Sequence, residues 1–341
     1  MPTSYFDLPT DEQRQLLGSA ASSSGRAPNV IEKDIWLCFV LQQLFTTPER
    51  KAMAFKGGTS LSKVYSVIKR FSEDVDVTID YRELGCETPL SELKNLSGRH
   101  RAALAEKLKE RVSHYTHNVI QPHLKTAVDK LGCTKGCAVN VSDNGEELRV
   151  FYPSGVANSS GYMREFVLIE FGGRNIVEPH EVHTIEPDIA EAFAGIAFPK
   201  AEGVVVLAAE RTFWEKVTLI HAQCHRPIAQ DRERVSRHWY DLAMLAQHET
   251  GKRAVTDLKL LGDVIDLKNT FYRSATTHYG LCLSGELRLV PDAENRLKLA
   301  EDYKHMQDAG MLNGHLYPME RILDELTALQ HQINQLAIAA R

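Results

Sequence analysis

A seven-residue segment in which acidic and β-branched residues alternate constrains the fold of this chain more than any other feature. It runs from Asp74 to Asp80 and reads Asp-Val-Asp-Val-Thr-Ile-Asp. Successive side chains of a β-strand point to opposite faces of its sheet, so this period of two predicts a strand with one acidic face. Asp74 and Asp76 then project to the same side, close enough to share a hard cation. Taken alone, such a pair is also typical of an exposed strand face whose acids only confer solubility.

A glycine-containing turn precedes the acidic strand. We predict a short strand over residues 52–56, then the turn Gly57-Gly58-Thr59-Ser60, then a helix from Leu61 to Lys69. Exposed backbone N–H groups and a helix N-terminus favour phosphate, and the two glycines permit close approach of a triphosphate. The hydroxyls of Thr59 and Ser60 can donate to its oxygens. The turn lacks P-loop spacing, and by itself it is also consistent with a simple tight turn.

Together these elements resemble the core of the polymerase-β-like nucleotidyltransferase superfamily, although the interval between Thr59 and Asp74 is slightly longer than in many members. They are most similar to the AbiEii/AbiGii toxin family, whose members look like Lys-Gly-Gly-Thr-x-Leu followed by Arg-Phe-Ser-x-Asp-x-Asp. Both motifs are present here, at residues 56–61 and 70–76. The resemblance continues in three further blocks, Glu-Lys-Asp-Ile-Trp at 32–36, Glu-Arg-Thr-Phe-Trp-Glu-Lys at 210–216 and Trp-Tyr-Asp-Leu at 239–242.

The resemblance implies roles for particular residues. Asp74 and Asp76 would hold Mg²⁺, or Mn²⁺, while Gly58, Thr59 and Ser60 would cradle the phosphates of a nucleoside triphosphate (NTP). Lys216 resembles the family's third-motif lysine, and its compact ammonium suits a contact to the triphosphate. Asp241 resembles the fourth-motif aspartate, which would either orient Lys216 or act as a base on the acceptor hydroxyl. Without the family order, Lys216 and Asp241 also fit a solvated helix face.

Four further residues are weaker candidates. Glu170 ends an apolar strand and can supply a third metal carboxylate, or can instead pair with Arg174. Lys63 and Arg70 are additional phosphate candidates, and Ser72 can shape the entry of the metal-binding strand. Each of these residues also fits a purely structural role.

The remaining pattern predicts an α/β (α+β) protein in two domains. We expect a nucleotidyltransferase core with a mixed sheet and an N-terminal helix over residues 1–190, then a mainly helical domain over 191–341 that completes the active-site cleft. Asn29 and Glu32 resemble a capping box at the start of a buried helix ending at Phe45. The Ser19 to Ser24 patch is interpreted as a loop. Further strands are predicted at 138–141, 148–152, 166–171 and 204–207, and helices within 90–131 and at 208–224, 239–248, 258–272, 293–306 and 319–336.

Composition narrows the cellular setting. No apolar run approaches the roughly 18 residues that a membrane helix needs, and the N-terminus lacks a secretory pattern, so we expect a cytoplasmic protein without a membrane partner.

The six cysteines are expected to be free thiols. Zinc is not expected, because neither Cys133 with Cys137 nor the group His221, Cys224 and His225 has finger-like spacing. The net charge is −5, yet residues 94–135 carry nine Lys or Arg against three Asp or Glu, which suits contact with an RNA backbone, although charged helices also simply face water.

We therefore predict a Mg²⁺-dependent enzyme that transfers a nucleoside monophosphate from an NTP to an acceptor. The family resemblance implies an RNA acceptor, with the 3′ end of tRNA expected, and a toxin of a type IV-like toxin–antitoxin or phage-defence pair whose antitoxin is encoded nearby. Two alternatives stay open. One is transfer to a protein hydroxyl or a small molecule such as an aminoglycoside, and the other is a nucleotide-binding regulator without turnover.

Overall fold

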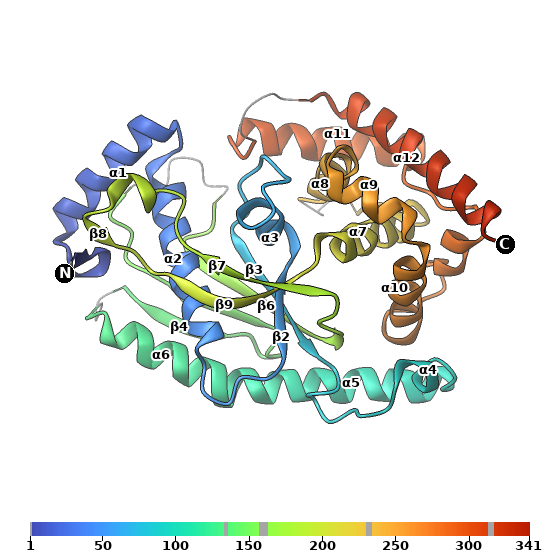
Figure 1. The fold of residues 1–341 in the computed structure, drawn as a ribbon, viewed down its shortest axis with the longest axis horizontal. Helices are drawn as coiled ribbons and strands as arrows, with labels where there is room; N and C mark the ends of the chain where they lie inside the picture. Colours follow the sequence, from blue (N-terminus) through green and yellow to red (C-terminus); the bar gives the residue numbers. More distant parts are fainter. Residues whose placement is uncertain (1, 133–135, 157–162, 230–233, 313–316) are drawn as a thin grey trace. The chain divides into compact units, whose positions relative to one another are not determined.

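The chain folds into a mixed α/β structure with one large sheet and many helices (Figure 1). The computed structural model describes residues 2–132, 136–156, 163–229, 234–312 and 317–341. The predicted fold class, α/β with a mixed sheet and a helical C-terminal part, is confirmed.

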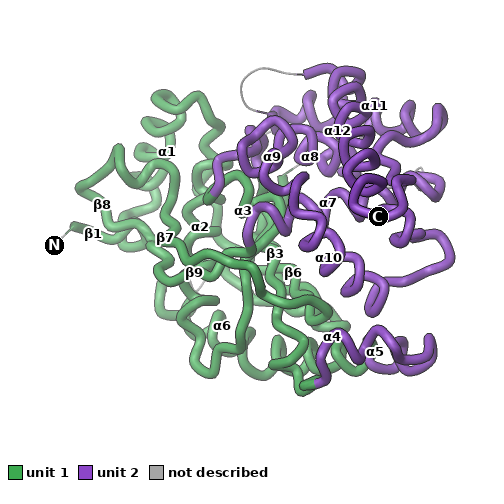
Figure 2. The backbone as a smooth tube through the Cα atoms, turned by 45° about the vertical axis from the view of Figure 1, so that its right-hand side comes forward, with its two compact units in different colours: residues 1–64, 72–87, 105–207 green, residues 65–71, 88–104, 208–341 purple. Residues whose placement is uncertain are grey.

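The chain divides into two compact units, coloured separately in Figure 2. Unit 1 comprises Met1–Val64, Ser72–Glu87 and Ala105–Leu207, and unit 2 comprises Tyr65–Phe71, Thr88–Leu104 and Ala208–Arg341. The main transition therefore falls between Leu207 and Ala208, whereas the sequence had suggested residue 190. Two short earlier segments also belong to unit 2, and one is held there by the Phe71 N–H, which donates to the Met311 carbonyl at 2.8 Å.

Unit 1 is built on a seven-stranded sheet with the order β4-β5-β6-β3-β2-β9-β7. The β3–β6 and β2–β9 pairs are parallel and the other pairs are antiparallel, so the sheet is mixed. Its strands are β2 (Met53–Lys56), β3 (Asp74–Asp80), β4 (Ala138–Val141), β5 (Glu147–Phe151), β6 (Phe166–Asn175), β7 (His180–Ile185) and β9 (Ala201–Leu207). Two short strands, β1 (Thr3–Ser4) and β8 (Ile196–Ala197), pair separately in parallel.

Strand β3 lies near the centre of this sheet and matches the prediction residue for residue. Val75, Val77 and Ile79 are at most 1% exposed, so one face of the strand is apolar. The other face carries the acidic residues and Thr78. In register, Asp76 lies opposite Lys56 of β2 and Glu170 of β6.

Strand β7 was not predicted, because it lies at the edge of the sheet and reads His-Glu-Val-His-Thr-Ile. Its central apolar residue, Val182, is 62% exposed, so the strand lacks the apolar face that a period-two pattern needs. Strand β6 also runs four residues past the predicted end at Phe171, through two glycines.

The first helices of unit 1 begin or end at other residues than the sequence predicts. Helix α1 (Thr10–Ser24) includes the serine patch that we interpreted as a loop, because serine hydroxyls donate to carbonyls one turn back, as Ser24 does to Ala20 at 2.7 Å. Helix α2 (Pro28–Phe45) begins one residue before Asn29, without a side-chain cap. The Glu32 carboxylate does not form the capping box and instead accepts hydrogen bonds from Ser154 and from the Gly155 N–H.

Helix α3 (Gly57–Lys63) includes the glycine turn and ends six residues before the predicted end at Lys69. The segment that follows is rich in β-branched and aromatic residues, and Ser66 has a φ of +53°, which a helix cannot accommodate. Farther along, α4 (Leu90–Leu93), α5 (Gly98–Tyr115), the π-helix η2 (Thr116–Ile120) and α6 (Gln121–Lys130) confirm the helical prediction for 90–131.

Unit 2 consists of helices, as predicted for the C-terminal part of the chain. They are α7 (Ala209–Cys224), α8 (Arg237–Gln247), α9 (Glu249–Thr256), α10 (Leu258–Phe271), α11 (Ala293–Asp308) and α12 (Met319–Ala339). Among these six helices, α9 was not predicted, and it is a short polar helix that begins directly after α8. In the described residues of both units, no helix combines the length and apolar character that crossing a membrane requires.

Candidate active site

The acidic strand and the glycine turn meet in unit 1. Gly57 adopts a φ of +82°, and a β-carbon built on it would lie 2.0 Å from Asp76 Oδ2. Only glycine therefore lets the Asp76 carboxylate lie against the turn while the backbone keeps this left-handed conformation. The antiparallel register of Lys56 with Asp76 fixes the contact.

The hydroxyls of the turn are used inside the protein. Thr59 and Ser60 are 0% exposed. The Thr59 hydroxyl donates to the Asp74 carbonyl at 2.5 Å and lies 2.9 Å from the Ser72 hydroxyl, while Ser60 donates to the Gly57 carbonyl at 3.0 Å. Both side chains thus fasten the turn to itself and to β3, and Ser72 contacts the entry of the strand. Hydroxyl donation from Thr59 and Ser60 to a phosphate stays a prediction.

The two aspartates differ in their surroundings. Asp74 is 5% exposed, and its Oδ1 lies 3.2 Å from Nη1 of Arg164. Asp76 is partly exposed, and within the described ranges no hydrogen bond or ion pair to its carboxylate is present. Glu170 lies on the adjacent strand in register with Asp76, and therefore on the same face of the sheet.

These residues suit a small oxygen-seeking ion. Mg²⁺ is commonly held by one or two carboxylates, with substrate phosphates and water completing its coordination. Asp74 and Asp76 meet that requirement without a third acid. No cluster of three or more His, Cys, Asp or Glu arranged as metal ligands occurs among the described residues, so metal ligation by Glu170 stays a prediction.

Sequence reasoning missed a buried network that holds the start of β3. Lys33 is fully buried in α2, and its ammonium donates to Glu73 Oε2 at 2.6 Å and to the Arg164 carbonyl at 2.7 Å. The Arg164 N–H donates to the same Glu73 oxygen at 3.1 Å. Burial lowers the pKa of Lys33, against the opposing charge of Glu73. Lys33 lies in the 32–36 block of the family resemblance, which was the available signal, but sequence alone did not reveal its partner.

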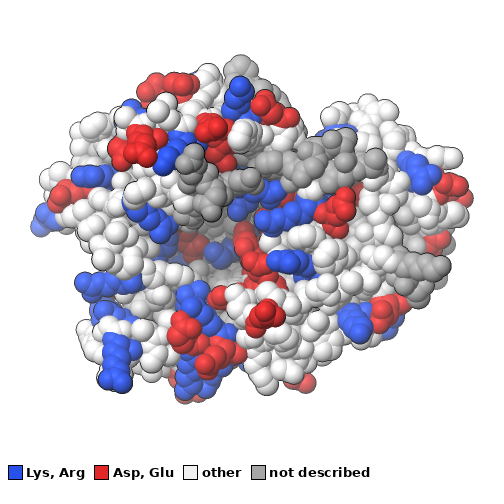
Figure 3. Space-filling model, turned by 180° about the vertical axis from the view of Figure 1, so that it is seen from behind, with Lys and Arg blue, Asp and Glu red and all other residues white. Residues whose placement is uncertain are grey.

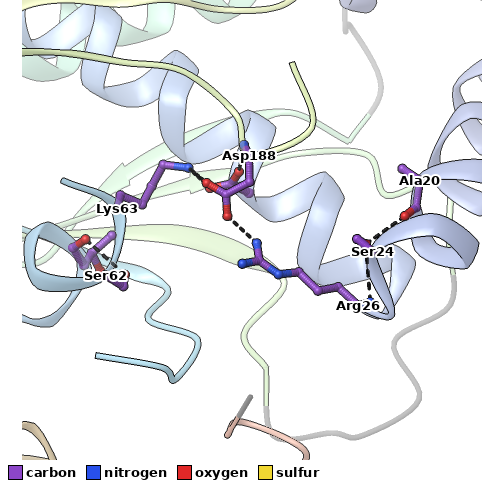
Figure 4. Close-up of polar contacts among 8 residues, drawn as sticks. Ala20, Ser24, Arg26, Ser62, Lys63 and Asp188 are labelled. Carbon is purple, nitrogen blue, oxygen red and sulfur yellow. Dashed lines mark hydrogen bonds and ion pairs between the residues drawn. The ribbon is translucent and has the colours of Figure 1, made fainter. Parts of the chain in front are cut away.

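Lys63 lies between two carboxylates. Its ammonium is 2.6 Å from Asp34 Oδ1 and 2.8 Å from Asp188 Oδ1, and Asp188 also pairs with Arg26 (Figure 4). Burial lowers the pKa of Lys63, but the neighbouring anionic groups, Asp34 foremost, raise it by more, so Lys63 carries its charge at neutral pH. These contacts support the structural role that was one reading of Lys63, and its phosphate contact stays a prediction.

In unit 2, Asp241 is held by two cations. Arg70 donates to it in a two-point contact, Nε to Oδ1 at 2.7 Å and Nη2 to Oδ2 at 2.8 Å, and the Lys216 ammonium lies 2.8 Å from Oδ2. Asp241 is 0% exposed. Burial raises its pKa, but Arg70 and Lys216 lower it by more, and the net result lies far below the usual range. A buried carboxylate this acidic is a poor proton acceptor, so the geometry favours the orienting role for Asp241 over the base role.

The Asp241 carboxylate contacts two cations, and their charges influence the groups nearby. Burial lowers the pKa of Lys216 despite the attraction of Asp241, and Arg70 and Arg237 lower it further. His238 lies in the same field, and burial, Lys216 and Arg237 drive its pKa well below its usual range. The two cations that contact Asp241 are a feature that suits an anion such as a phosphate.

The histidines of α7 have structural contacts. The His221 Nε2 lies 3.1 Å from the His278 carbonyl, and its Nδ1 accepts the Arg288 N–H at 3.0 Å. Cys133 lies outside the described residues, and Cys38, Cys86, Cys224 and Cys282 are free thiols, as predicted. Two pockets in unit 1, about 380 and 370 Å³, lie around Phe6 and are lined by neither Asp74 nor Asp76.

Paired strand carboxylates beside a Gly-Gly-Thr-Ser turn, in a mixed sheet, define a nucleotidyltransferase-type site. The comparison with protein families agrees: the model described as "Nucleotidyl transferase AbiEii toxin, Type IV TA system" matches residues 40–325. The chain belongs to this family, and it is a nucleotidyltransferase of the toxin class.

Two other comparisons add little. The solved structure of MenT4, nucleotidyltransferase toxin Rv2826c from Mycobacterium tuberculosis H37Rv, aligns over 96% of this chain and 99% of its own, at 18% identity and a TM-score of 0.40. A search of curated proteins found no match.

Proposed function

We propose that this protein transfers a nucleoside monophosphate from an NTP to an RNA hydroxyl in a Mg²⁺-dependent reaction. The observation that carries the proposal is the contact of the Asp76 carboxylate with Gly57, beside Asp74 on the same strand face. It supports a metal-binding carboxylate pair next to a turn that a phosphate can approach closely.

The reaction is an in-line displacement. The acceptor oxygen forms a bond to the α-phosphorus, the bond from that phosphorus to the bridging oxygen breaks, and pyrophosphate leaves while the hydroxyl proton passes to water. Mg²⁺, or Mn²⁺ in its place, would neutralise charge on the phosphates when bound. Asp74 and Asp76 would hold it, and the Gly57 turn would admit the triphosphate. The protein contributes mainly alignment and charge compensation.

Lys216 is proposed as the cationic contact to the triphosphate. Its ammonium is fixed by Asp241, which in turn is fixed at two points by Arg70. A lysine held this way needs little reorganisation to meet an anion, because its position is already set. In this proposal Arg70 acts through Asp241 and Lys216, and a direct phosphate contact by Arg70 is not required.

An RNA acceptor is supported by the charges on α5 and α6. Lys107, Lys125 and Lys130 are exposed on these helices, in the part of the sequence with nine basic residues against three acidic ones. Figure 3 shows that Lys and Arg side chains are accompanied by Asp and Glu on the face it displays. Exposed lysines on a helix suit backbone contacts that carry no sequence information, so the tRNA 3′ end is proposed here from the family resemblance.

Toxicity would follow if nucleotides were added to an RNA end that translation needs. Family membership implies a cognate antitoxin, and we propose that it is encoded beside this chain and that the pair acts in the cytoplasm. Phage defence would be one outcome of arrested translation.

The direct experiment incubates the purified protein with total tRNA, Mg²⁺ and each α-labelled NTP in turn. We expect label in RNA with at least one NTP, equimolar pyrophosphate release, and neither with Asp76→Asn. Transfer to tRNA whose 3′ ribose has been oxidised with periodate should fail, because that treatment destroys the acceptor hydroxyls.

Label in protein or in an added aminoglycoside, with none in RNA, would replace the RNA acceptor by the alternative acceptor class. NTP binding without pyrophosphate release from any acceptor would favour a non-catalytic regulator. The double charge reversal Lys107→Glu with Lys125→Glu is expected to weaken transfer to RNA and to leave the thermal stability nearly unchanged.

A further inference from the structure

Arg164 is attached to the metal-binding strand by its main chain. Its N–H donates to Glu73 and its carbonyl accepts from the buried ammonium of Lys33, at 3.1 and 2.7 Å. Glu73 is the residue directly before Asp74. The backbone of Arg164 is thus fixed beside Asp74 by contacts that do not involve its side chain.

The guanidinium of Arg164 is held far less tightly. Among the described residues it makes one contact, 3.2 Å to Asp74 Oδ1, and the Arg164 side chain is 36% exposed. Contacts between a charged nitrogen and a carboxylate are commonly about 2.7–2.9 Å, and strong arginine pairs use two of them. A partly exposed side chain with one long contact can leave by rotating about its own bonds, without any movement of the main chain.

Charge explains why a cation sits at this position. Glu73, Asp74 and Asp76 follow one another within four residues. Lys33 pairs with Glu73, and Arg164 pairs with Asp74. Without Arg164, Asp74 would lose this neighbouring positive charge. A bound divalent ion would supply the missing compensation and make the Arg164 charge superfluous, since both occupy the field of the same carboxylates.

We propose that the Arg164 guanidinium is a resident counter-cation for Asp74 that a divalent ion displaces when it binds. This inference rests on the proposed function only in assuming that Asp74 and Asp76 bind such an ion. Arg164 is in this sense a positioning residue: it holds the Asp74 carboxylate in place before the ion arrives, and it lowers the affinity of the site for the ion.

The test measures Mn²⁺ binding directly, by the electron paramagnetic resonance signal of free Mn²⁺, in the full-length protein without nucleotide. The variants are Arg164→Gln, Asp74→Asn and Arg14→Gln. Arg14 is the matched control, because it is also an arginine of unit 1 that contacts an aspartate, at 2.7 Å. Its side chain is more exposed than that of Arg164, at 55% against 36%. Replacing either arginine by glutamine changes the net charge by the same amount. Thermal unfolding with EDTA and with Mn²⁺ provides a second readout.

We expect Arg164→Gln to bind Mn²⁺ about three- to tenfold more tightly than the wild type, as follows from removing a competing cation of modest affinity. Its melting temperature should rise more on addition of Mn²⁺ than that of the wild type. Arg14→Gln should match the wild type in both measurements.

Two results would overturn different parts of the argument. Mn²⁺ affinity in Arg164→Gln equal to or weaker than in the wild type, with Asp74→Asn losing the ion, would refute displacement and leave the metal site intact. Absence of Mn²⁺ binding in the wild type, or binding that Asp74→Asn does not weaken, would refute the carboxylate pair as a metal site and the displacement with it.

Discussion

Two arginine–aspartate pairs, one in each unit, show how similar groups serve different purposes. Arg70 and Asp241 make a two-point contact at 2.7 and 2.8 Å, with side chains 5% and 0% exposed. Arg164 and Asp74 make one contact of 3.2 Å, and the arginine side chain is 36% exposed. The first aspartate has its oxygens committed to protein cations, whereas the second is held by a contact that a ligand can replace.

This difference between the two pairs indicates which aspartate is structural and which one we propose as a metal ligand. A carboxylate saturated by a buried guanidinium and an ammonium is part of the scaffold that fixes Lys216. The Asp74 carboxylate, next to the partly exposed Asp76 and in one 3.2 Å contact with Arg164, is the one that we propose to bind an ion. The sequence motifs mark both Asp74 and Asp241 as candidate site residues. Their neighbours in space indicate different roles for the two.

The largest effect is expected for Asp76→Asn. Removing one charge from the carboxylate pair should reduce nucleotidyl transfer on the order of 10³-fold or more, because charge compensation at the phosphates would be lost. Stability should change by no more than about 0.5 kcal/mol, since the side chain is partly exposed. Steady-state transfer to tRNA and urea unfolding measure the two quantities. Glu181→Gln, an exposed acid on β7, serves as the control, and equal activity in both variants would remove Asp76 from the site.

The second effect is on stability. Arg70→Gln leaves Asp241 buried with only Lys216 as its charged partner, and breaking a buried pair costs about 3–5 kcal/mol. We expect the free energy of unfolding to fall by about 3 kcal/mol or more. Urea unfolding followed by circular dichroism measures it. A loss below about 1 kcal/mol would mean that the two-point contact is not a structural anchor, and the contrast between the two pairs would fail.

A third effect concerns the free energy of unfolding at acid pH. The pKa of Asp241 is lower in the folded protein than the usual value near 4 of an unfolded chain. Its contribution is therefore complete above about pH 5 and is lost as the pH falls below that range, because the unfolded state then binds the proton first. The stability difference between wild type and Asp241→Asn should narrow by about 1 kcal/mol between pH 7 and pH 3, and further at lower pH. The surface variant Asp11→Asn should show no comparable narrowing, and a constant gap for Asp241→Asn would contradict the assignment.

Sequence reasoning was most accurate where one short pattern determines the structure. The alternation in Asp74–Asp80 specifies both the strand and its acidic face, and the observed bounds agree. The neighbouring residues 57–60 were predicted as a turn before a helix, and they form the first turn of α3 instead. The structure explains Gly57 by its left-handed backbone and by the Asp76 carboxylate against it.

Features that depend on distant residues could not be predicted in the same way. Lys33 and Glu73 are 40 residues apart, and the Arg164 N–H reaches Glu73 across 91 residues. The domain transition was placed too early because β9 continues unit 1 to Leu207, and residues 65–71 join unit 2 through pairing with Met311 and Leu312. Neither contact leaves a periodic signal in the local sequence.

A fourth effect, on the order of tenfold in activity, tests the turn beside Asp76. In Gly57→Ala the added β-carbon would meet the Asp76 carboxylate, so that side chain must rotate away, and misplacing a reacting group by about 1 Å can cost up to about 10²-fold. Gly203→Ala is the matched control, because Gly203 has a φ of +65° but nothing within 4 Å of the added carbon. Both variants should lose about 1 kcal/mol from backbone strain, and only Gly57→Ala should lose transfer activity. Equal activities would show that the Asp76 position does not matter.

The smallest effect is expected when the same substitution is made in the second pair, Arg164 with Asp74. Arg164→Gln, measured without divalent ions, should lower the free energy of unfolding by less than about 1 kcal/mol, since a single partly exposed contact contributes little. The backbone contacts of Arg164 to Lys33 and Glu73 remain in this variant, so β3 keeps its anchor. Urea unfolding in EDTA, side by side with Arg70→Gln, gives the ratio of the two losses. If Arg164→Gln cost as much as Arg70→Gln, the Asp74 carboxylate would be as firmly committed to its arginine as Asp241 is, and an ion could gain access to it only by destabilising the fold.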